Sequence, residues 1–156
     1  MEQKESVSLA HLVERTLEII GKALEINGIQ ITVEKESDEE IFTYVNEVTQ
    51  VILNVLKNSE DVIKERAIKN PYITIRIHST SDWEEVYIED NAGGIAESVL
   101  PHIFEPYFST KSEKNGTGLG LYMSKTIIEE HCNGLILASN TNEGARFTIR
   151  LKKGQS

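Results

Sequence analysis

The chain has 156 residues and a formal net charge of −9, with 39% apolar and 26% charged residues. This length and composition predict one globular domain with a single core. The acidic balance and the lack of a strongly basic segment argue against a nucleic-acid partner.

The sequence has no run of about 18 apolar residues and no leader followed by a cleavage site. We therefore expect a cytoplasmic domain that makes no membrane contact, in a protein that can itself be membrane-anchored. The single cysteine, Cys132, has no partner at metal-ligand spacing, so we expect a buried structural thiol.

Residues 8–26 place apolar side chains at helical spacing and predict an amphipathic helix. Ser8 or Ser6 is suited to cap its start, and Gly28 is suited to end it. Residues 29–33 then alternate between apolar and polar, which is typical of a half-buried strand.

Residues 45–68 carry the strongest helical pattern, and one line of this helix is polar. Gln50, Asn54 and Asn58 follow one another at intervals of four, so their carboxamides stack along one edge. Asparagine is a poor helix former, and its amide is costly beside a core face unless it finds a partner. The residues alone leave two interpretations open, a satisfied edge or a ligand-binding edge.

Residues 72–78 and 83–89 alternate well and predict two paired strands. Asp90 comes where the second strand ends and a loop of Asn, Ala and Gly begins. In a layered α/β domain this place commonly holds a ligand-reading side chain, although a turn-forming aspartate is the alternative.

Residues 90–121 contain five of the ten glycines of the chain. Two glycine clusters around a polar loop suggest a cradle for a phosphate-bearing ligand. The long aromatic and proline-containing segment 101–115 is predicted to be a lid. The second cluster, 116–121, leads into a helix at 121–132 whose free amides suit phosphate oxygens. A hairpin at 135–151 completes the domain.

Two common nucleotide motifs are excluded by spacing. Gly116, Gly118 and Gly120 do not fit G-x-G-x-x-G, and no strand precedes them, so a dinucleotide-binding Rossmann domain is not indicated. No glycine is followed by Lys and then Ser or Thr, which excludes a P-loop.

In this order the motifs resemble the ATP-binding catalytic domain of sensor histidine kinases, within the superfamily that includes DNA gyrase B, MutL and the heat-shock chaperone ATPases. Residues 54–59 resemble the N box of that family, 90–94 its first glycine box, 103–111 its F box and 116–121 its second glycine box. The resemblance covers nearly the whole chain, 1–156, as one catalytic domain. It implies a two-layer α/β sandwich (α+β), with about three helices on one face of a mixed, largely antiparallel sheet and a nucleotide lid.

The resemblance also implies a site for ATP and Mg²⁺. Asn58 would give its amide oxygen to Mg²⁺, Asn54 lies one turn away in the same site, and Asp90 would accept a hydrogen bond from the adenine amino group. Gly94 would let the ring approach, Phe104 and Phe108 would anchor the lid, and Lys111 with the amides of Gly118 and Gly120 would meet the phosphates. The other positions that the resemblance places at the nucleotide are Asp61, Ile95, Gly116, Thr117, Leu119 and Leu121.

The implied activity is that of a protein-histidine kinase in two-component signal transduction. The γ-phosphoryl group of Mg-ATP would pass to a histidine on a dimerisation hairpin and then to an aspartate of a response regulator. Superfamily members that hydrolyse ATP place a glutamate where this chain has Asn54, which cannot act as a base, so slow hydrolysis is expected. The alternative function is a self-sufficient ATPase or a nucleotide-gated interaction module of the same fold.

No phosphoacceptor histidine is evident in the chain. His11, His78, His102 and His131 all lie outside the family's context, which is a histidine followed by an acidic residue on a helical hairpin. We therefore expect no dimerisation domain in this chain and no autophosphorylation by it alone. The acceptor then lies in a preceding part of the same protein, which we favour, or in a separate protein.

Two positions depart from the family pattern. Ala92 stands where the first glycine box usually has glycine, which puts the local backbone angle in question. Asp61 stands where many relatives carry a basic residue for the phosphates.

Overall fold

The computed structural model describes residues 2–106 and 120–154. Its helices are α1 (Leu9–Ile26), α2 (Val45–Glu65) and α3 (Gly120–Thr126), with a short 3-10 turn η1 (Leu100–His102) and a π-helical turn η3 (Ile127–His131). Its strands are β1 (Glu5–Ser8), β2 (Gln30–Lys35), β3 (Glu40–Thr43), β4 (Tyr72–Ser79), β5 (Trp83–Asp90), β6 (Gly134–Asn140) and β7 (Ala145–Lys152).

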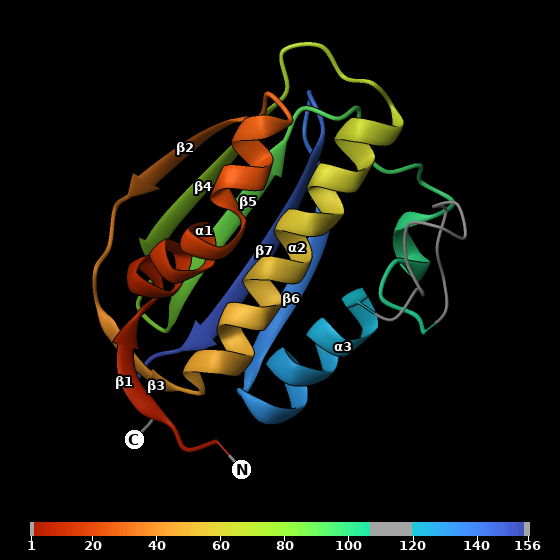
Figure 1. The fold of residues 1–156 in the computed structure, drawn as a ribbon. Coiled ribbons are helices and arrows are strands. Elements are labelled where there is room, and N and C mark those ends of the chain that lie inside the picture. Colours follow the sequence, from red (N-terminus) through yellow and green to blue (C-terminus); the bar gives the residue numbers. More distant parts are fainter. Residues whose placement is uncertain (1, 107–119, 155–156) are drawn as a thin grey trace.

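Five strands form one sheet in the order β2-β4-β5-β7-β6. Only β2 and β4 pair in parallel, and the other neighbours are antiparallel. The helices α1, α2 and α3 all lie on the same face of this sheet (Figure 1). Ile75, Ile88 and Phe147, which are partners across β4, β5 and β7, are buried in the core between the layers. The expected two-layer sandwich with a mixed, largely antiparallel sheet is therefore confirmed.

Helix α1 begins after a serine cap and ends just before a left-handed glycine, as its sequence predicts. The Oγ of Ser8 accepts a hydrogen bond from the amide of His11 at 3.1 Å, so Ser8 rather than Ser6 is the cap. At the other end Gly28 adopts a left-handed φ of 74°, and the amide of Ile29 returns to the carbonyl of Leu24 at 3.0 Å.

Helix α2 ends at Glu65, earlier than the expected residue 68. Ala67 takes a left-handed φ of 49°, and the amide of Ile68 donates to the carbonyl of Ile63 at 3.1 Å. These features form a Schellman-type end, which is usually built around glycine. Because alanine rather than glycine stands at this position, nothing in the sequence indicated that the helix ends here.

The N-terminal segment adds a feature that the sequence did not predict. Strand β1 pairs with β3 in a separate two-stranded antiparallel sheet. Ahead of it, the carboxylate of Glu2 accepts hydrogen bonds from the amides of Asn46 at 2.7 Å and Glu47 at 3.2 Å. The N-cap residue of α2, Tyr44, makes no such bond with its own side chain, so Glu2 caps α2 from a distant part of the chain.

The last helical stretch is less regular than the expected single helix at 121–132. It consists of α3 and then the π-helical turn η3, after which Asn133 has a left-handed φ of 55°. Cys132 is buried directly behind this turn, as expected for a structural thiol. Burial raises the pKa of its thiol to about 11, chiefly because the thiolate would lose its hydration.

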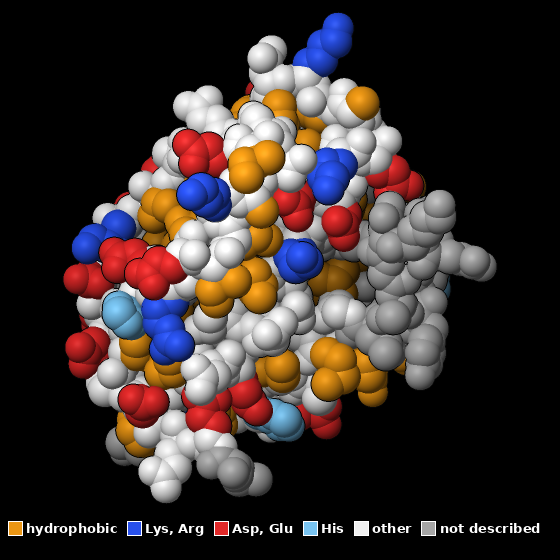
Figure 2. All heavy atoms as spheres, in the orientation of Figure 1, with side chains coloured by type: hydrophobic (Ala, Val, Ile, Leu, Met, Phe, Trp, Pro, Cys, Tyr) orange, Lys and Arg blue, Asp and Glu red, His pale blue; other side chains and the backbone are white. Residues whose placement is uncertain are grey.

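None of the helices in residues 2–106 and 120–154 is long and apolar enough to cross a membrane. Acidic and basic side chains are interspersed over the helix-bearing face of these residues (Figure 2).

Candidate functional site

Asp90 is the last residue of β5, and its side chain is fixed there by the backbone around it. The residue is only 6% exposed. Its Oδ1 accepts hydrogen bonds from the amides of Ala92 at 3.0 Å and Ala145 at 3.2 Å. Among the described residues Oδ2 receives no hydrogen bond. The second oxygen of a largely buried carboxylate, whose other oxygen is fixed by two backbone amides, is thus available to a ligand.

Gly144 explains how the turn between β6 and β7 comes so close to Asp90. A Cβ on Gly144 would lie 2.1 Å from the carbonyl oxygen of Asp90 and 2.6 Å from its Oδ1. No side chain fits there. The chain therefore uses glycine at this position for close backbone approach, which brings the amide of the next residue, Ala145, to the carboxylate.

The turn after Asp90 contains the left-handed backbone angles that its glycines permit. Gly93 and Gly94 have left-handed φ values of 92° and 82°. Ala92 has no positive φ, and it is 1% exposed with its methyl group in the core. Position 92 therefore does not need the left-handed backbone angle that favours glycine, which answers the question raised by this departure from the family pattern.

Two side chains that the sequence did not single out hold this turn. Nη1 of Arg66 donates to the carbonyls of Ala92 at 2.6 Å and Gly94 at 2.8 Å. The amide group of Asn140 accepts from the amide of Ile95 and donates to its carbonyl, both at 2.7 Å. Arg66 follows the end of α2 and Asn140 ends β6, so no sequence motif connects either to residues 92–95.

Of the three carboxamides aligned on α2, those of Gln50 and Asn54 are hydrogen-bonded to described residues and that of Asn58 is not. Nε2 of Gln50 donates to Oδ1 of Asn54 at 2.9 Å, and Nδ2 of Asn54 donates to Oγ of Ser124 at 3.2 Å. Ser124 is buried and donates in turn to the carbonyl of Gly120 at 2.9 Å. Asn58, half-buried one turn further along α2, has no side-chain hydrogen bond to any described residue. The satisfied-edge interpretation thus fits Asn54, and the ligand interpretation fits Asn58.

The remaining site residues fall partly outside the described part of the chain. Phe104 is half-buried and packs edge-on against Phe147, with ring centroids 6.3 Å apart, and the ammonium of Lys125 lies 5.4 Å from the centroid of the Phe104 ring. Asp61 and Ile95 are half-buried near the ends of α2 and β5, and Gly120 and Leu121 open α3. Phe108, Lys111, Gly116, Thr117, Gly118 and Leu119 lie outside the described residues.

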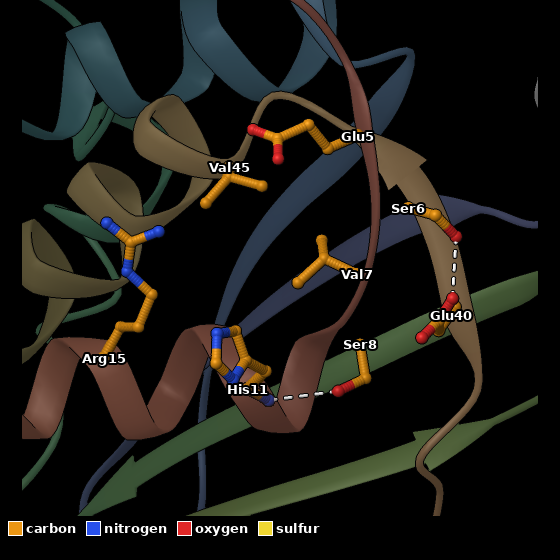
Figure 3. Close-up of a pocket in the computed structure, with 8 residues that line it drawn as sticks. All are labelled: Glu5, Ser6, Val7, Ser8, His11, Arg15, Glu40 and Val45. Atoms are coloured by element: carbon orange, nitrogen blue, oxygen red, sulfur yellow. Dashed lines mark hydrogen bonds between the residues drawn. The ribbon is translucent and has the colours of Figure 1, made fainter.

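Three of the four histidines pair with glutamates, and the fourth lines a separate hollow. His78 pairs with the buried Glu85 at 2.8 Å, His102 with Glu105 at 2.6 Å, and His131 with Glu47 at 3.2 Å. His11 lines a separate hollow of about 380 Å³ at the opposite half of α2 (Figure 3). The walls of that hollow are Glu5, Ser6, Val7, Ser8, His11, Arg15, Glu40 and Val45. It contains none of the site residues expected from the sequence.

The chain belongs to the family of histidine kinase-, DNA gyrase B-, and HSP90-like ATPases, whose model matches residues 43–155. The signal transduction histidine-protein kinase AtoS of Escherichia coli K12 is 37% identical over 155 residues, which are 96% of this chain and 24% of AtoS. The two-component sensor PprA of Pseudomonas aeruginosa is 32% identical over 146 residues, 88% of this chain and 15% of PprA. The chain therefore spans less than a quarter of the length of either relative.

Solved structures show the same fold. The nucleotide-free catalytic domain of the histidine kinase ThkA aligns with a TM-score of 0.85 at 24% identity, covering 97% of this chain and 96% of that domain. A structure of ThkA in complex with the response regulator TrrA aligns with a TM-score of 0.79 at 22% identity, covering 96% of this chain and 42% of that one.

Proposed function

We propose that this domain binds Mg-ATP and presents the γ-phosphoryl group to a histidine outside the chain, in two-component signal transduction. The observation that carries the proposal is the buried carboxylate of Asp90, whose Oδ1 is held by the amides of Ala92 and Ala145. A carboxylate fixed in this way offers Oδ2 to the exocyclic amino group of adenine. Membership in the family and the kinase relatives support the same function.

The residues present fit a magnesium ion held mainly by the nucleotide. Mg²⁺ prefers oxygen and binds nucleotide phosphates with few protein ligands. In the described part of the chain no three His, Cys, Asp or Glu side chains are grouped so that they could hold a metal. Asn58 offers a half-buried amide oxygen on α2, so it would complete a coordination sphere otherwise made of phosphate oxygens and water. The bound ion would neutralise charge on the phosphates during transfer.

The proposed reaction needs positioning more than a protein base. A neutral imidazole nitrogen attacks the γ-phosphorus with its lone pair, the bond to the β-phosphate oxygen breaks, and ADP leaves with the electron pair of that bond. The imidazolium proton passes to solvent or to a neighbouring acid. The solved complex of ThkA with the response regulator TrrA supports a response regulator as a partner, and an aspartate of that partner would be the next acceptor.

The state of Asn54 favours transfer over hydrolysis. An ATPase of this superfamily would need a base at this position, and a carboxamide is not one. Its oxygen moreover accepts a hydrogen bond from Gln50 and its nitrogen donates one to Ser124, so both polar groups of this side chain already have protein partners.

Binding is tested by calorimetric titration with a non-hydrolysable ATP analogue, with and without Mg²⁺. We expect Asp90→Ala to abolish binding, and Asn58→Ala to retain weaker binding that no longer depends on Mg²⁺. Asp82→Asn is a matched control, because Asp82 is exposed in the turn between β4 and β5. Folded wild-type protein that binds no nucleotide would leave an interaction module of the same fold as the better conclusion.

Hydrolysis separates the kinase from the ATPase alternative. With γ-labelled ATP and the wild-type domain alone, we expect almost no release of free phosphate. Release at about 1 per second or faster, an ordinary enzyme turnover, would establish a self-sufficient ATPase instead.

A further inference from the structure

Side chains of two other elements form hydrogen bonds with the turn that follows Asp90, one on each side of it. The end of α2, the loop after β5 and the turn between β6 and β7 meet at one end of the molecule (Figure 1). Arg66 reaches the turn from the first of these, and Asn140 from the last.

We propose that Arg66 and Asn140 are positioning residues that preset the first glycine box for adenine before any nucleotide binds. This inference rests on the proposed function of the site, and it assigns neither residue a contact with the reacting atoms. The two side chains act through the backbone of residues 92–95, which would lie against the base.

The contacts of Arg66 require the left-handed form of the turn. One nitrogen, Nη1, bonds the carbonyls of Ala92 and Gly94, at 2.6 and 2.8 Å. The backbone between those two carbonyls runs through Gly93 and Gly94, whose φ values of 92° and 82° are both left-handed, and in this form both carbonyls reach one nitrogen. Glycine visits positive and negative φ almost equally, so without the guanidinium this turn would sample other shapes. Hydrogen bonds from a charged donor are stronger than those between neutral groups.

The guanidinium of Arg66 is not needed by α2 itself. The carbonyls in the last turn of α2 accept hydrogen bonds from backbone amides. The amide of Arg66 donates to the carbonyl of Val62 at 3.0 Å, that of Ala67 to the carbonyl of Lys64 at 3.2 Å, and that of Ile68 to the carbonyl of Ile63. The side chain is therefore free to serve the glycine turn rather than the helix end.

Asn140 holds the far side of the turn as a neighbouring strand would. Its carboxamide bonds both the amide and the carbonyl of Ile95 at 2.7 Å. A Cβ on Gly94 would lie 3.0 Å from the same Asn140 oxygen, so the carboxamide packs directly against the glycine. Ordering the loop in advance saves the nucleotide the entropic cost of ordering it, which increases affinity.

The test combines hydrogen exchange of the nucleotide-free domain with nucleotide titration. The variants are Arg66→Met, Arg66→Lys and Asn140→Ala, with Lys64→Met as the control. Lys64 is an exposed basic residue in the last turn of the same helix, so its loss matches the change in charge and in helix dipole. Urea unfolding confirms that each variant is folded.

We expect amide exchange in residues 91–96 to accelerate about tenfold in Arg66→Met and Asn140→Ala, with the rest of the chain unchanged. Affinity for ADP and for the ATP analogue should fall by the same factor, roughly tenfold, because the loss concerns the base and not the phosphates. The Mg²⁺ dependence should persist. Arg66→Lys keeps a cationic donor and should lose less, and Lys64→Met should match the wild type.

The exchange experiment keeps this inference separate from the proposed function, because it needs no nucleotide. Unchanged exchange in residues 91–96 in both Arg66→Met and Asn140→Ala would overturn the positioning role even if the wild type binds ATP. Faster exchange with unaltered nucleotide affinity would overturn presetting for adenine, and a wild type that binds no nucleotide would instead refute the proposed function.

Discussion

Replacing glycine by alanine should raise the free energy of unfolding at one position of this domain and lower it at another. Gly21 lies inside α1, where a Cβ would meet only the Cβ of Leu17 at an ordinary 3.8 Å. Alanine is the better helix former, so Gly21→Ala should raise the free energy of unfolding by about 0.5–1 kcal/mol. At Gly144 a Cβ would lie 2.1 Å from the carbonyl oxygen of Asp90. The turn must then move, which should cost about 1–3 kcal/mol or more.

Urea unfolding followed by far-UV circular dichroism measures both changes, and the slope of the transition should stay constant. In thermal unfolding each kcal/mol should shift Tm by about 2–4 °C for a chain of this size. Gly144→Ala should also weaken nucleotide binding, because displacing the turn withdraws the amide of Ala145 from Asp90. If Gly144→Ala were as stable as the wild type, the close packing of this turn on Asp90 would be refuted.

Three further substitutions or conditions test other parts of the structure. Ala67→Gly should raise the free energy of unfolding by about 1 kcal/mol in urea, because glycine adopts the left-handed φ of 49° without strain. Ser59→Ala should leave that free energy unchanged or raise it by up to about 1 kcal/mol, because the buried hydroxyl of Ser59 has no hydrogen-bond partner among the described residues. The Cys132 thiol, with its pKa raised from 9.0 to about 11, should react slowly with thiol reagents up to that pH in the folded protein. Its protonated form stabilises the fold fully below pH 9, so stability should fall as pH rises from about 9 through 11, and Cys132→Ala should lack this fall.

The sequence predicts those parts of the fold in which local signals and packing agree. Residues 8–26 combine a helical apolar stripe with a serine cap and a glycine stop, and the structure has α1 there. Strands β4 and β5 likewise follow from alternation alone, and the end of β5 places Asp90 at the base of a glycine turn. Each of these features depends on neighbours within a few positions of the chain.

Features that depend on distant residues were not predictable. The capping of α2 by Glu2 joins positions far apart in the sequence, and β1 is a strand only because β3 pairs with it. The left-handed Ala67 lacks the glycine that usually marks a helix end. At the site the same limit applied to Arg66 and Asn140, because a surface arginine and a strand-ending asparagine carry no local sign of the carbonyls they bind.

Helix α2 contacts the first glycine box near one end, and near its middle it is linked to Gly120 of the second box. Asn54 connects α2 through Ser124 to the carbonyl of Gly120, the residue of the second box at which α3 begins. Arg66, at the other end of the same stretch, connects α2 to the first box. Asn58 lies between these two connections and is left without a partner among the described residues. One helix thus carries the contacts to residues 92–94 and to Gly120, with the unbonded carboxamide of Asn58 between them on the same helix. Under the proposed function, this helix would hold the groups that meet the base and the groups that meet the phosphates in a fixed relation to each other.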